Sequence, residues 1–63
     1  MRLPIVEIKM WAGRTEEQKE RLVKEITEAV TRALGVEPKE TQVIIIEIPK
    51  SNWGISGRLA SKT

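Results

Sequence analysis

The sequence predicts an α/β fold, a β-α-β subunit in which one long helix joins two parallel strands. Three observations predict it: residues 4–11 alternate between apolar and polar side chains, residues 16–34 carry apolar side chains at helical spacing, and residues 42–48 are almost entirely apolar. Short connections around a single helix favour parallel pairing of the two strands. The chain has 63 residues, and we expect residues 1–63 to form a single domain.

The first strand and the start of the helix are marked by local patterns. Branched or long apolar side chains fall on one face of the strand: Val6, Ile8 and Met10. This period of two is typical of a strand. Gly13 ends the alternation, and Thr15 followed by Gln18 predicts a capping box at the start of the helix.

The helix is predicted to cover residues 16–34, with Gly35 as its C-terminal stop. Its expected apolar stripe consists of Leu22, Val23, Ile26, Ala29, Val30, Ala33 and Leu34. Its solvated face offers three ion pairs at a spacing of four, Glu17–Arg21, Glu20–Lys24 and Glu28–Arg32. A polar connection containing Pro38 follows. Residues 53–57 predict a hairpin or loop that contains two glycines.

The second strand has almost no polar face, because four of its seven residues are isoleucine. Both of its sides should therefore be covered, and one helix can cover only one side. A chain this short also has a thin core, and it has no Cys for a disulfide. We therefore expect two subunits to share a four-stranded sheet across a two-fold axis.

Composition excludes several classes of function. The formal charge is only +2 and basic residues are scattered, which argues against a nucleic-acid partner. No apolar stretch reaches the ~20 residues of a membrane span, and no signal peptide is visible, so the default location is cytoplasmic. Without His or Cys there is no catalytic triad, thiolate or typical zinc site. Glu7 and Glu47 lie on strands, where facing water is the simpler interpretation.

Both ends of the chain resemble one known family. The segments Pro4–Met10, Gly13–Thr15 and Glu17–Lys19 are similar to the opening of the 4-oxalocrotonate tautomerases, and residues 54–57 and 59–62 are similar to their closing segment. The resemblance covers residues 4–62 without gaps. It implies a hexamer, a trimer of dimers, that catalyses 1,3-proton shifts in small unsaturated keto or hydroxy carboxylic acids without a cofactor.

The resemblance also implies the site residues. Pro4 matches the amino-terminal proline whose free amine is the general base, Arg14 matches a cation that binds the substrate carboxylate, and Trp53 matches an aromatic residue that makes the site apolar. Gln42 stands where many members have a second Arg. It can donate a hydrogen bond to the substrate but carries no charge.

Pro4 departs from the family pattern, because Met1, Arg2 and Leu3 precede it and its nitrogen is a tertiary amide without a basic lone pair. Removal of Met1 alone would not expose it, and the bulky Arg2 disfavours that removal. Some bacterial leucine codons serve as start codons. If translation begins at the Leu3 codon, Met removal would leave Pro4 as the amino terminus.

Simpler interpretations stand beside each assignment. Pro4 could merely begin a strand, Arg14 could be a loop cation, and Gln42 could be a polar residue at the start of a strand. Trp53 could be an anchor in an oligomer interface, and Trp11 is expected at an interface or pocket rim. Three hypotheses follow: a tautomerase, a non-catalytic subunit of the same fold, or a module that binds a small anion through Arg14. The state of the amino terminus distinguishes the first two.

Overall fold

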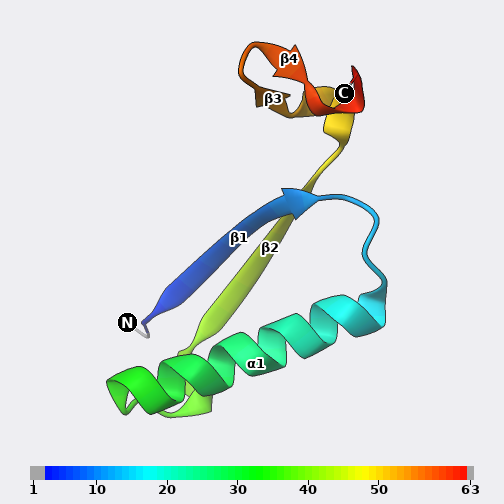
Figure 1. Cartoon of the computed structure of the whole chain (residues 1–63). Coiled ribbons are helices and arrows are strands. Elements are labelled where there is room, and N and C mark those ends of the chain that lie inside the picture. The colour runs from blue at the N-terminus through cyan, green and yellow to red at the C-terminus, as the bar shows by residue number, and fades with distance from the viewer. Residues whose placement is uncertain (1–2, 63) are drawn as a thin grey trace.

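The computed structural model describes residues 3–62. Its elements are β1 (Ile5–Trp11), α1 (Glu16–Leu34), a 3-10 turn (Pro38–Glu40), β2 (Gln42–Ile48), a 3-10 turn (Lys50–Asn52), β3 (Gly54–Ile55), β4 (Arg58–Leu59) and a final 3-10 turn (Ala60–Lys62). Strands β1 and β2 pair in parallel along their full lengths. The predicted β-α-β fold is confirmed, with the first strand starting at Ile5 and not at Pro4 (Figure 1).

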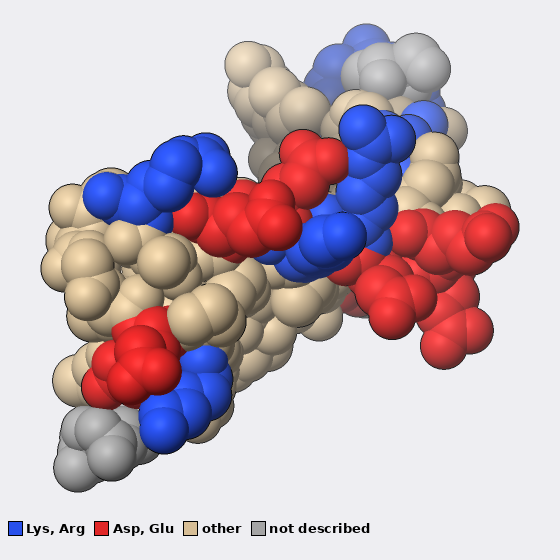
Figure 2. Space-filling view, turned by 90° about the horizontal axis from the view of Figure 1, so that it is seen from below, with Lys and Arg blue, Asp and Glu red and all other residues tan. Residues whose placement is uncertain are grey.

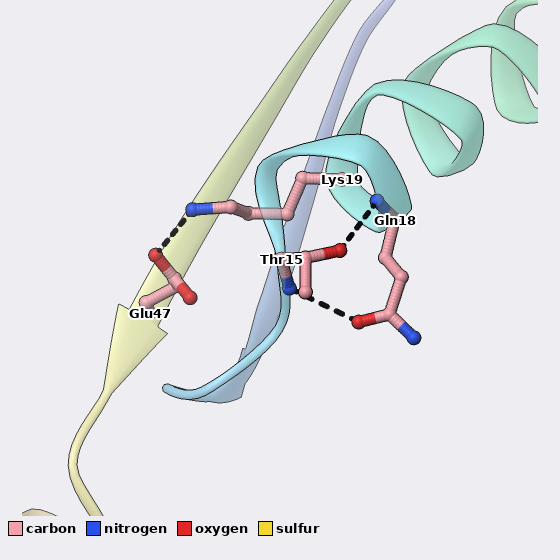
Figure 3. A network of polar contacts seen from close by, with 4 residues as sticks. All are labelled: Thr15, Gln18, Lys19 and Glu47. Carbon is pink, nitrogen blue, oxygen red and sulfur yellow. Dashed lines mark hydrogen bonds and ion pairs between the residues drawn. The ribbon is translucent and has the colours of Figure 1, made fainter.

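Local hydrogen bonds define both ends of the helix, as predicted. The amide of Gln18 donates to the hydroxyl of Thr15 at 3.1 Å, and the amide of Thr15 donates to the Gln18 side chain at 3.0 Å (Figure 3). At the other end Gly35 has a φ of 73°, and its amide donates to the carbonyl of Thr31 at 2.9 Å. Glycine adopts this left-handed conformation without the steric cost that other residues meet.

The helix covers one face of the two-stranded sheet (Figure 1). Met10 shares a pocket with Leu22 of the helix, and Glu47 bonds Lys19, so the face that contains both strand residues is turned to α1. By strand register that face carries Val6, Ile8, Met10, Val43, Ile45 and Glu47. The opposite face carries Ile5, Glu7, Lys9, Trp11, Gln42, Ile44, Ile46 and Ile48, and we call it the open face.

The apolar stripe of the helix is narrower than predicted. The half-buried apolar residues are Leu22, Val23, Ile26 and Val30, whereas Ala29, Ala33 and Leu34 are exposed. Leu34 is 62% exposed. The prediction was wrong at these three positions because two strands only ~4.8 Å apart cannot reach the flank of a helix ~10 Å wide.

The outer face of the helix carries mixed charge. Seen from below, it shows basic and acidic side chains interspersed (Figure 2). A shallow hollow there is lined by Glu17, Glu20, Arg21, Lys24, Glu25 and Glu28. Arg21 bonds Glu25 at 2.7 Å. The prediction of ion pairs was wrong, because none of the three predicted pairs forms among residues 3–62. Arg21 has a Glu four residues away on each side, and its guanidinium bonds the later one.

A short hairpin follows the second strand. Ser56 and Gly57 both have positive φ, 52° and 81°, which is the conformation of a two-residue type I′ turn. The hairpin is closed by the amide of Ala60, which donates to the carbonyl of Trp53 at 2.7 Å. Of the hairpin and loop alternatives open from the sequence, the structure has the hairpin.

The subunit has almost no core of its own. Ala60 is the one buried apolar residue among residues 3–62, while Ile5 and Ile44 on the open face are 45% and 41% exposed. The radius of gyration is 14.6 Å, against about 10.6 Å for a compact domain of this length. The open face is therefore a largely apolar surface that this chain does not cover by itself.

Within the described residues, the helix is not apolar enough to cross a membrane.

Candidate active site

Two of the four candidate residues meet where the parallel strands begin. The amide of Gln42 donates to the carbonyl of Pro4 at 3.1 Å, which continues the strand pairing by one step beyond β1. Pro4 is half-buried and Gln42 is exposed on the open face. Parallel strands start at the same edge of a sheet, so the topology alone brings these residues together.

Arg14 and Trp53 lie toward the opposite end of the sheet. Arg14 follows the last residue of β1 by three positions, and Trp53 follows the 3-10 turn after β2. The Trp53 ring meets Trp11 edge to face, with ring centroids 6.0 Å apart and an interplanar angle of 80°. Trp11 in turn lines a pocket of about 250 Å³ with Ala12, Gly13, Arg14 and Lys50.

The length of β1 separates these two groups. The strand has seven residues, which at ~3.3 Å per residue extend for about 23 Å. Figure 1 shows the amino end and the β3–β4 hairpin at opposite ends of the sheet. A single chain therefore brings Pro4 to Gln42, and Trp53 to the wall of the Arg14 pocket, but does not bring the two groups together.

Arg14 also lines a second pocket, on the helix side of the sheet. This pocket of about 300 Å³ is bounded by Met10, Arg14, Gln18, Lys19 and Leu22. The two cations that line this pocket differ in their ion pairing, because Lys19 bonds Glu47 at 2.9 Å. Arg14 forms no ion pair within residues 3–62. Its guanidinium therefore remains open to an external anion.

Glu47 is part of the scaffold and is a poor general base. The hydrogen bond from Lys19 is the largest effect and lowers the pKa of Glu47. Desolvation opposes it, and the charge of Lys19 and the backbone amide of Gly13 lower the pKa by smaller amounts. Glu47 is exposed to solvent, as expected, but its side chain is 29% exposed and turns toward the helix to bond Lys19 (Figure 3). Glu7 is exposed on the open face, as expected.

One residue at this end was not anticipated from the sequence. The ammonium of Lys50 lies 4.6 Å from the centroid of the Trp11 ring. The only signal in the sequence was the spacing of three residues between Lys50 and Trp53, which a 3-10 turn places on one side. Trp11 was expected as a pocket rim or interface residue, and it does line the Arg14 pocket.

The nitrogen of Pro4 is bonded to the carbonyl carbon of Leu3, so in this chain it is an amide and has no basic lone pair. Two of the three residues that precede Pro4, Met1 and Arg2, lie outside the described residues.

The chain matches known proteins over nearly its whole length. The family model for tautomerase enzymes matches residues 4–62. A 2-hydroxymuconate tautomerase of Pseudomonas putida is 45% identical over 60 residues, 95% of each chain. A 4-oxalocrotonate tautomerase isozyme of Methylibium petroleiphilum is 40% identical, with a TM-score of 0.88 over 92% of this chain and 94% of the other.

A further solved structure, YwhB, is described as a homologue of 4-oxalocrotonate tautomerase. It is 38% identical and superposes with a TM-score of 0.91 over 95% of this chain and 98% of its own. The family match, the identity of the relatives and the shared fold cover the same residues. By this evidence the chain belongs to the tautomerase family.

Proposed function

We propose that this chain is a cofactor-free tautomerase that moves a proton between oxygen and carbon in small unsaturated 2-hydroxy or 2-keto carboxylic acids. The observation that carries the residue assignment is the position of Pro4, half-buried where the strands begin and joined to Gln42 by a 3.1 Å hydrogen bond. Several relatives are named for 2-hydroxymuconate, which is an acid of this class.

As a free amino-terminal amine, Pro4 would act as the general base. An α-amino group titrates near 7.7–8.0, and apolar surroundings with nearby cations favour its neutral form. The amine takes the proton of the 2-hydroxyl group, the O–H electrons form the carbonyl, and the displaced π pair takes a proton back from the prolinium at carbon. A base with a pKa near the working pH suits both transfers.

The other candidate residues would hold the acid in place. Arg14 offers a planar fork of donors to a carboxylate, and Gln42 donates an uncharged hydrogen bond beside Pro4. Trp53 supports the Trp11 wall of the pocket and so contributes apolar surface. A lower local dielectric strengthens each of these interactions.

The distance between the two groups requires more than one chain. Pro4 and Arg14 are separated by the seven residues of β1, so a complete site would combine Pro4 of one subunit with Arg14 and Trp53 of another. The open face supplies apolar surface for such contact, with Ile5 and Ile44 exposed. We infer a homo-oligomer, a hexamer built as a trimer of dimers.

The cytoplasmic location expected from the sequence also stays a prediction, to be tested by cell fractionation.

The deciding experiment compares a protein that begins at Pro4 with the full chain, using 2-hydroxymuconate. We expect turnover from the protein that begins at Pro4 and negligible turnover from the full chain, whose Pro4 nitrogen is an amide. Negligible turnover by both would reject the proposal and favour the non-catalytic subunit. Strong turnover by the full chain would show that a group other than Pro4 is the base.

A further inference from the structure

We propose that Lys50 is a second cationic contact for the substrate, holding the same carboxylate as Arg14. This inference rests on the proposed function, because it assigns one more residue to the same site. Lys50 and Arg14 line one pocket of about 250 Å³, together with Trp11, Ala12 and Gly13. That volume is just below the range of about 300–1,000 Å³ typical of small-molecule pockets.

The backbone holds Lys50 in position. Lys50 opens the 3-10 turn Lys50–Asn52, and the amide of Trp53 donates to the Lys50 carbonyl at 3.2 Å. Pro49 precedes the turn, with a φ of −63° that its ring fixes. The side chain of Lys50 therefore starts from a defined point beside the pocket.

The Trp11 ring orients the ammonium group. The Lys50 nitrogen lies over this ring, 4.6 Å from its centroid, and Trp53 supports the same ring edge to face. A cation over an indole is stabilised by about 0.5–1 kcal/mol at an exposed site. Contact with the ring uses one side of the ammonium, and its other N–H donors remain for an anion.

Neither cation of this pocket forms an ion pair with another described residue. The ion pairs among residues 3–62 are Lys19–Glu47 and Arg21–Glu25, and neither includes Arg14 or Lys50. Lys19, the cation of the neighbouring pocket, is already occupied by Glu47. Two unneutralised cations beside an indole wall favour a carboxylate on a flat unsaturated chain.

Calorimetric titration of the full chain with muconate tests the proposal. Muconate, hexa-2,4-dienedioate, has no hydroxyl or keto group and cannot tautomerise, so the measurement is independent of Pro4. We expect Lys50→Gln to raise the Kd of muconate about tenfold, which corresponds to ~1.4 kcal/mol. Lys50→Arg should restore binding, and Lys24→Gln on the outer helix face should leave it unchanged.

The neutral diamide of muconate separates charge recognition from packing, since its Kd should not change in Lys50→Gln. Equal losses for muconate and the diamide would overturn the proposal, because Lys50 would then act only through Trp11. Unchanged muconate binding in Lys50→Gln, or no binding by the unsubstituted chain, would overturn it as well. Lys50-dependent binding of muconate, together with no turnover of 2-hydroxymuconate by the protein that begins at Pro4, would leave the carboxylate contact standing and remove the proposed function.

Discussion

Lys19 of the helix donates a 2.9 Å hydrogen bond to the carboxylate of Glu47 at the end of β2, across 28 residues of sequence. Both side chains are about one-third exposed, at 31% and 29%. The bond ties the first turns of α1 to the sheet next to Arg14. It therefore links the stability of the fold to the geometry of the candidate site.

This bond predicts a loss of stability in acid. The pKa of Glu47 lies below its ordinary value of 4.5, chiefly because of the hydrogen bond from Lys19. A carboxylate with a lowered folded pKa contributes stability above its unfolded pKa and loses it as the pH falls through the folded pKa. We expect Glu47→Gln to unfold more readily at neutral pH and to lose less stability on acidification than the parent chain.

Urea unfolding at fixed protein concentration, from neutral pH to about pH 3, measures this effect. Glu17→Gln is the matched control, because Glu17 lies on the outer face of the helix and forms no ion pair among the described residues. Identical pH profiles for the Glu47 and Glu17 variants would contradict the prediction.

The capping box predicts a local stability effect. Thr15 and Gln18 satisfy each other's backbone amides at 3.0–3.1 Å. Thr15→Ala leaves one amide of the first turn without its partner and should cost about 1 kcal/mol of unfolding free energy. Thr15→Ser retains the hydroxyl and should stay within a few tenths of the parent chain. Denaturant midpoints measure both, and equal midpoints for the two variants would show that the cap adds nothing.

Arg14 is predicted to act on turnover. In a protein that begins at Pro4, Arg14→Ala should lower kcat/KM. The activation free energy should rise by roughly 2–4 kcal/mol, the effect of removing one preorganised charge-stabilising donor. Arg32→Ala, on the last turn of the helix, is the control for loss of one positive charge. An unchanged kcat/KM would make Arg14 an ordinary surface cation.

In the companion variant Gln42→Arg we expect better turnover, because this substitution places a positive charge beside Pro4.

The open face is predicted to drive association. Ile44 is 41% exposed at the middle of this face. A charge placed there would have to be buried on assembly, at high cost in free energy. Ile44→Lys should therefore shift sedimentation toward smaller species, while Glu20→Lys on the outer helix face should not. A folded monomer of the parent chain at micromolar concentration would remove the basis of the oligomer.

Local signals made the main elements predictable. The capping box of Thr15 and Gln18 and the glycine at position 35 each act within one turn of the helix, so the sequence alone predicts both helix ends. The structure has the helix ends at these residues. The strand pair followed from residue spacing in the same way. Pro4, Arg14, Gln42 and Trp53 came from family resemblance, and residue chemistry alone did not select them.

Features that depend on distant partners were not predictable. The direction of Glu47 is set by Lys19, and the exposure of Leu34 depends on the width of the sheet. Lys50 was identified as a candidate site residue only from its position over the ring of Trp11, which lies 39 positions earlier in the sequence. The choice of Glu25 as the partner of Arg21 likewise depends on side-chain conformations that spacing does not fix.

The position of Pro4 and Arg14 at opposite ends of β1 has a genetic consequence. If a site takes Pro4 from one chain and Arg14 from a neighbour, two defective alleles can complement each other. A chain without Arg14 still contributes a sound Pro4, and a chain without the proline still contributes a sound Arg14. Mixed assemblies would then hold a fraction of intact sites, whereas each allele alone would hold none. If one chain supplied the whole site, no mixture of the two alleles would restore activity.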